Sequence, residues 1–131
     1  MKKIKITIYY MTILILHLMH SYLERNESAS FINNWYQYCT YYYLEIGGMV
    51  VAIVIFLLYL MKIKWSYFAS LIYFTIMIVN GLYHITSIIL EGKSFNSNEG
   101  SILTSSGFIV IGILLVHLLR KNKSKLYNSS I

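Results

Sequence analysis

Residues 65–90 have the sequence WSYFASLIYFTIMIVNGLYHITSIIL, which contains no aspartate, glutamate, lysine or arginine. A helix needs roughly 20 mostly apolar residues to cross a bilayer, so this stretch is long enough to do so. The rest of the 131-residue chain is similar, since 57% of all residues are hydrophobic, 12% are charged and the mean hydropathy is +0.59. A soluble fold of this size cannot bury so much apolar surface. The composition therefore argues against a soluble enzyme and a disordered chain, and it predicts an integral membrane protein.

Three further apolar stretches flank residues 65–90. They run from about Ile4 to Leu23, from Leu44 to Ile63 and from Ser101 to Leu119. None of them alternates as a barrel strand would, and the chain has no proline. Because a backbone in lipid must satisfy its own hydrogen bonds, each stretch is expected to be a helix. We predict an all-α membrane protein, in which residues 1–131 form a single membrane domain with a four-transmembrane-helix bundle.

The basic residues separate clearly along this four-span pattern. Only Arg25 and Lys93 fall at one end of the bundle, whereas the other nine fall at the opposite end: Lys2, Lys3, Lys5, Lys62, Lys64, Arg120, Lys121, Lys123 and Lys125. Because basic residues concentrate in cytoplasmic segments, we predict a multi-pass protein of the plasma membrane with both termini in the cytoplasm. The expected partners are the lipid bilayer and either a second copy of the chain or another membrane protein, and not nucleic acid.

The first apolar stretch also allows a different interpretation. Residues 1–5 are basic, the apolar run continues to Met19, and Ser28-Ala29-Ser30 resembles the cleavage site of a signal peptide. Cleavage would leave three spans. The four-span interpretation is favoured, because the basic residues separate clearly between the two ends of the bundle when this segment is counted as a span.

Polar side chains gather at one depth of the predicted bundle. In an antiparallel arrangement the outer end of the first span meets the start of the second, the end of the third and the start of the fourth. Seven residues fall there: His17, His20, Glu24, Glu45, Asn80, His84 and Thr104. Placing ionisable groups inside a bilayer costs free energy, so such a cluster indicates a functional or structural role. His117 is the exception, since it lies near the inner end of the fourth span.

These residue types indicate two kinds of site and one structural alternative. Imidazole and carboxylate groups are ligands of zinc, iron and manganese, and they also form proton relays near neutral pH. Alternatively, they hydrogen-bond between helices and only hold the bundle together. The predicted ligands of a transition metal ion, or titrating groups, are His20, Glu24 and His84, with His17, Glu45 and Asn80 in support. The sequence leaves open whether the protein is an enzyme, because the same histidines and glutamates could act as acid/base groups on a lipid-like substrate. Cys39, the only thiol, has no evident activating partner.

The chain resembles the HXXEE group of small membrane proteins. The group is named for a histidine followed by two glutamates at the end of the first span, and the matching stretch here is His20-Ser-Tyr-Leu-Glu24. Asn80-Gly-Leu-Tyr-His84 and Glu99-Gly100-Ser-Ile-Leu-Thr104 match its later motifs. Two positions differ from the motifs of the group, since Leu23 replaces the first glutamate and Glu99 replaces a proline. The resemblance implies a four-span architecture and a site, but no reaction.

Two other classes of function remain open. A small, basic, four-span protein could confer immunity to a bacteriocin or another membrane-active peptide, with the aromatic segment from Trp35 to Tyr43 meeting the peptide. It could also be an accessory subunit of a membrane transporter, with Gly48 and Ala52 forming a small-residue contact.

Overall fold

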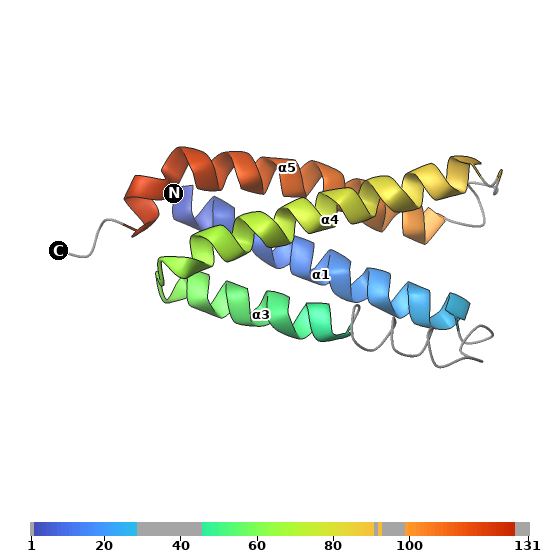
Figure 1. The fold of residues 1–131 in the computed structure, drawn as a ribbon, viewed down its shortest axis with the longest axis horizontal. Coiled ribbons are helices and arrows are strands. Elements are labelled where there is room, and N and C mark those ends of the chain that lie inside the picture. Colours follow the sequence, from blue (N-terminus) through green and yellow to red (C-terminus); the bar gives the residue numbers. More distant parts are fainter. Residues whose placement is uncertain (1, 29–45, 91, 93–98, 128–131) are drawn as a thin grey trace.

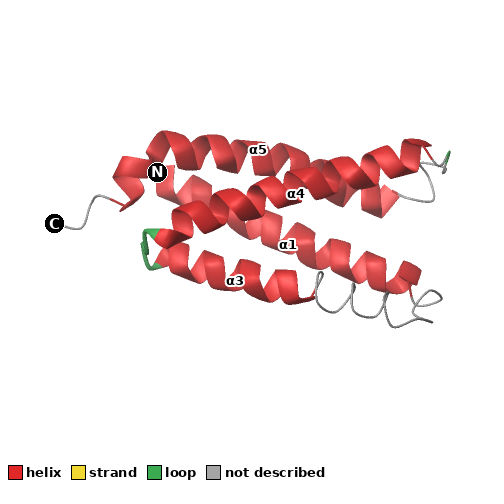
Figure 2. Ribbon diagram, in the orientation of Figure 1, coloured by secondary structure: helices red, strands yellow, loops and turns green. Residues whose placement is uncertain are grey.

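The structure is a computed structural model that describes residues 2–28, 46–90, 92 and 99–127, and the side chains of 4–23, 46–90, 92 and 100–124. These residues form the helices α1 (Lys2–Ser28), α3 (Gly47–Leu60), α4 (Trp65–Leu90) and α5 (Glu99–Tyr127) (Figure 1). No strand occurs in these ranges (Figure 2), so the prediction of an all-α protein is confirmed for them.

Three of the helices are long and apolar enough to cross a membrane. Their candidate spans are Ile4–Leu23 in α1, Trp65–Leu90 in α4 and Gly100–Ser124 in α5. The apolar helix α3 has 14 residues, which gives a length of about 21 Å at 1.5 Å per residue. It therefore covers only the central part of the predicted span 44–63. α1 begins and α5 ends at the same end of the bundle, as Figure 1 shows.

α4 and α5 form the most extensive helix contact, and α1 packs mainly against α5. Two glycines allow α4 and α5 to approach closely. A Cβ atom added at Gly81 of α4 would lie 2.5 Å from the backbone oxygen of Ser105, and one added at Gly112 of α5 would lie 2.7 Å from Cγ1 of Ile78. The helix α3 is more peripheral, with its contacts mainly to α4 and α1.

Aromatic rings fill the core at the end where α1 begins. Tyr10 of α1 is fully buried, and its ring centroid lies 4.8 Å from that of Phe56 and 4.7 Å from that of Phe74. The hydroxyl groups of Tyr10 and Ser70 are 3.1 Å apart and form a buried hydrogen bond between α1 and α4. Aromatic packing and this bond therefore fix how α1 sits against the hairpin of α3 and α4.

A tight turn joins α3 to α4. The N–H of Lys62 donates to the carbonyl of Tyr59 and the N–H of Ile63 donates to that of Leu58, both at 3.0 Å. These two bonds form a Schellman motif, which needs a left-handed residue after the helix cap. Lys62 is that residue, with φ of 60°.

Candidate functional site

Two histidines from different helices meet inside the bundle. His20 on α1 is only 1% exposed, and His84 on α4 is half-buried. Their Nε2 atoms are 3.2 Å apart and form a hydrogen bond. The two ring centroids lie 4.5 Å apart with the planes at 75°. The sequence placed these residues at the same depth on separate helices, and the structure brings them into direct contact.

The hydroxyl of Thr104 on α5 favours a proton on Nδ1 of His20. Its hydroxyl donates to the carbonyl oxygen of Gly100 at 3.0 Å, as a threonine inside a helix often does. The same Oγ1 lies 3.1 Å from Nδ1 of His20. A hydroxyl has one proton to donate, so when it goes to the Gly100 carbonyl, Oγ1 accepts from Nδ1–H of His20. In the neutral ring the lone pair therefore lies on Nε2, which faces His84.

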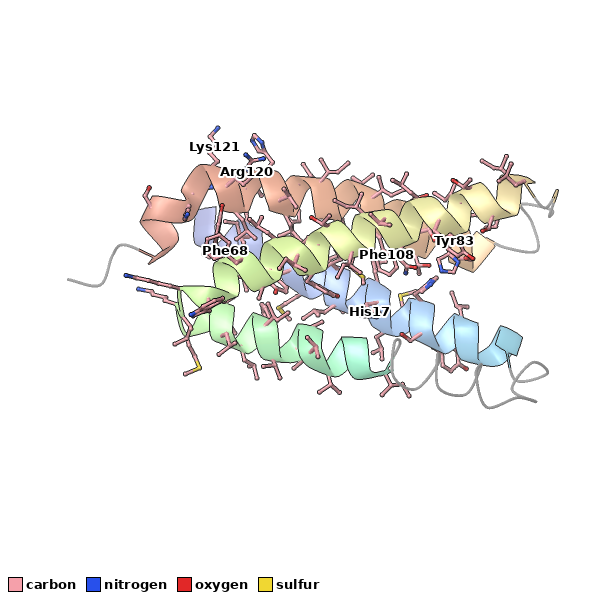
Figure 3. The ribbon with its side chains drawn as sticks, viewed as in Figure 1. His17, Phe68, Tyr83, Phe108, Arg120 and Lys121 are labelled. Carbon is pink, nitrogen blue, oxygen red and sulfur yellow. The ribbon has the colours of Figure 1, made fainter. Side chains whose placement is uncertain are left out.

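His17 lies one helical turn before His20 and has a different partner. Its Nδ1 is 3.1 Å from the hydroxyl of Tyr73 on α4. The buried ring of Phe108 on α5 lies between the two histidine sites, with its centroid 6.2 Å from that of His17 and 5.4 Å from that of His20. Figure 3 shows His17 and Phe108 in the interior of the bundle.

Asn80 does not join the His20–His84 pair. It lines a groove of about 720 Å³ between α3 and α4, together with His17 and Tyr73. Most of the remaining wall is apolar, including Val51, Ile55, Ile72, Ile76 and Met77. The described side chains of the predicted polar cluster therefore form two adjoining sites, with His20, His84 and Thr104 in one, and His17 and Asn80 beside Tyr73 in the other.

Several predicted residues lie outside the part of the chain that the structure describes. Glu45, Cys39 and the segment 31–43 are among them, and of Glu24 only the backbone in α1 is described. Within the described residues, no group of three histidine, cysteine, aspartate or glutamate side chains comes together. His117 is exposed on α5 and lines a hollow with Arg120 and Lys121.

Tyr73 and Phe108 belong to these sites although the sequence pattern did not predict them. A signal for Tyr73 was present, because it lies 7 and 11 residues before Asn80 and His84 and therefore on the same helical face. Phe108 lies four residues after Thr104, one turn further along α5. An aromatic residue in an apolar span carries no distinguishing signal by itself, so only the packing of the helices reveals its place.

Comparison of the chain with protein-family models, curated proteins and solved structures gives no match.

Proposed function

We propose that this is a small four-span membrane protein that binds a transition metal ion through Nε2 of His20 and Nε2 of His84. The distance of 3.2 Å between these two atoms carries the proposal. Two nitrogen ligands of a tetrahedral zinc ion, each about 2.05 Å from the metal, are separated by about 3.3 Å. The pair therefore needs little movement to hold an ion in place of the proton they share.

The hydrogen bond from His20 to Thr104 supports the same proposal. Metal-binding histidines usually donate their second ring N–H to a fixed acceptor, which orients the ring and raises its basicity. Nδ1 of His20 has such an acceptor in Oγ1 of Thr104, and Thr104 is itself held by the carbonyl oxygen of Gly100. Glu24 is one helical turn beyond His20 and is the proposed third ligand. The resemblance to the HXXEE group leads to the same residues.

The four-span topology with cytoplasmic termini is part of the proposal. Three helices have spanning length, and α3 would complete the fourth span together with the residues next to it. The charge pattern supports the orientation, because the described basic residues at the ends of α1, α3 and α5 fall at one end of the bundle: Lys5, Lys62, Lys64, Arg120, Lys121 and Lys123.

Metal content of the purified protein tests the site. The protein is purified in detergent with a tag that contains no histidine, and bound metals are measured by mass spectrometry before and after titration with Zn²⁺ or Co²⁺. We expect close to one ion per chain, and Co²⁺ should give the visible absorption of a tetrahedral site. His84→Ala should lose the ion and keep the helical circular dichroism signal.

His117→Ala is the matched control, because His117 is exposed on another part of α5 and should not affect binding. A wild-type protein that takes up no ion, with His84→Ala lowering the free energy of unfolding by about 1 kcal/mol, would contradict the proposal. The histidine pair would then be an interhelical hydrogen bond that stabilises the bundle.

A further inference from the structure

A basic hollow lies at the end of the bundle where α4 begins and α5 ends. Its volume is about 400 Å³, and four cationic side chains line it: Lys64, Arg120, Lys121 and Lys123. No carboxylate is among the described residues that line it. Figure 3 shows Phe68, Arg120 and Lys121 at this end, away from His17. The hollow therefore concentrates positive charge at a distance from the histidine pair.

Two aromatic rings position one of these cations. Nζ of Lys123 lies 4.8 Å from the ring centroid of Tyr67 and 5.2 Å from that of Phe68. These distances are in the range of cation–π interactions, which orient an ammonium group that would otherwise move freely in water. Part of the positive charge is thus held in place before any ligand arrives.

An apolar hollow continues from the basic one towards the middle of the bundle. Its volume is about 560 Å³, and it shares Arg120 and Lys121 with the basic hollow. The other residues that line it are Ile78, Ile113, Val116 and His117. Residues 113, 116, 120 and 124 lie on one face of α5, because they are spaced by three or four positions. The two hollows therefore form a continuous surface that is basic at the end of α5 and apolar towards its centre.

We propose that this surface binds one anionic phospholipid. The phosphate would lie among Lys64, Arg120, Lys121 and Lys123, and an acyl chain would lie along Ile78, Ile113 and Val116. Opposite charge favours the headgroup, and basic pockets between membrane helices are a known type of site for such lipids. The proposal requires that the protein lies in a bilayer, but it does not depend on the metal site or on which side of the membrane the termini face.

Lipid binding is measured by native mass spectrometry of the purified wild-type protein released from detergent. Phosphatidylglycerol and phosphatidylcholine with identical acyl chains are compared, and glycerol 3-phosphate is used as the headgroup alone. We expect phosphatidylglycerol to bind at least tenfold more tightly than the other two. Equal binding of both lipids would overturn the proposal, and so would glycerol 3-phosphate binding as tightly as phosphatidylglycerol, which would indicate a site for free phosphate esters.

Paired variants separate a site from general attraction to positive charge. Arg120→Gln with Lys121→Gln should weaken phosphatidylglycerol binding about 30-fold. Lys5→Gln with Lys62→Gln removes the same charge from exposed positions outside both hollows and should have little effect. Val116→Trp should fill the apolar hollow and weaken binding several-fold at unchanged charge. Equal losses in the two double variants would overturn the proposal.

Discussion

Thr104 and Ser105 are adjacent hydroxyl residues that are both fully buried, but only one of them has a partner on another helix. Oγ1 of Thr104 accepts from His20, whereas Oγ of Ser105 has no hydrogen-bond partner among the described residues. Thr104→Val keeps the shape of the side chain but leaves Nδ1–H of His20 without an acceptor. We expect the free energy of unfolding to fall by about 1–3 kcal/mol. Unfolding in mixed detergent micelles measures the change.

Ser105→Ala is the control for this substitution. It removes a buried hydroxyl group that makes no bond, so the stability should stay the same or rise slightly. If the metal proposal is correct, Thr104→Val should also weaken metal binding about 10- to 100-fold, while Ser105→Ala should not. Similar effects of both variants on stability would show that the Thr104–His20 bond does not stabilise the bundle.

The sequence was sufficient to predict which histidines share a depth, but not which atoms meet. Depth follows from counting residues along apolar stretches, and in this way His20, His84 and Thr104 were placed together. The contacts also depend on how each helix is rotated about its axis, and many side chains determine that rotation together. For this reason the sequence predicted Asn80 only as a supporting residue of the His20–His84 cluster, and it did not predict the groove that Asn80 lines with His17 and Tyr73.

At the scale of elements, the contact between α4 and α5 depends on Gly81. A Cβ atom there would lie 2.5 Å from the backbone oxygen of Ser105 and 3.3 Å from Cβ of Phe108, and backbone atoms cannot rotate away. We expect Gly81→Ala to lower the free energy of unfolding by about 1–3 kcal/mol, as overpacking usually does. The shift of helix α5 that relieves the clash should also disturb the His20–Thr104 bond.

Gly48→Ala is the matched control for the helix contact. Among the described residues, a Cβ atom at Gly48 would meet only Cε1 of His17, at 3.8 Å, which is an ordinary contact distance. Because alanine favours a helix over glycine by up to about 1 kcal/mol, this variant should be as stable as the wild type or more stable. Chemical unfolding of both variants side by side gives the comparison, and a larger loss for Gly48→Ala would contradict the close approach of α4 and α5 at Gly81.

The turn between α3 and α4 offers a stabilising substitution. Lys62 has φ of 60°, a conformation that costs an L-residue with a Cβ atom roughly 1 kcal/mol, whereas glycine adopts it readily. Lys62→Gly should therefore raise the thermal midpoint while its backbone bonds to Tyr59 and Leu58 persist. Lys64→Gly, two residues further along, relieves no such strain and should not raise it. The short turn was predictable from sequence, but its left-handed residue was not, because a lysine gives no signal for that conformation.

For the whole molecule, the proposed topology places the segment that contains Cys39 outside the cell. Cys39 is the only cysteine of the chain and lies outside the described residues, so a thiol reagent reports on this one position. A membrane-impermeant maleimide added to intact cells should label it, and a tag fused after Ile131 should resist added protease until the membrane is opened. Labelling that occurs only after detergent is added would contradict the orientation, provided that a cysteine introduced at Ser30 behaves in the same way.

The helix packing also has a consequence for the order in which the protein assembles during synthesis. The chain emerges from the ribosome from its N-terminus, so α1 is made first and α5 last. However, α1 packs mainly against α5, and His20 has its acceptor on that last helix. A nascent chain that ends before α5 can still form the bonds of α1 to α4 through Tyr10, His17 and His20. It lacks the packing surface of α5 and the bond from His20 to Thr104. Insertion of α5 is therefore the step that completes the packing of α1.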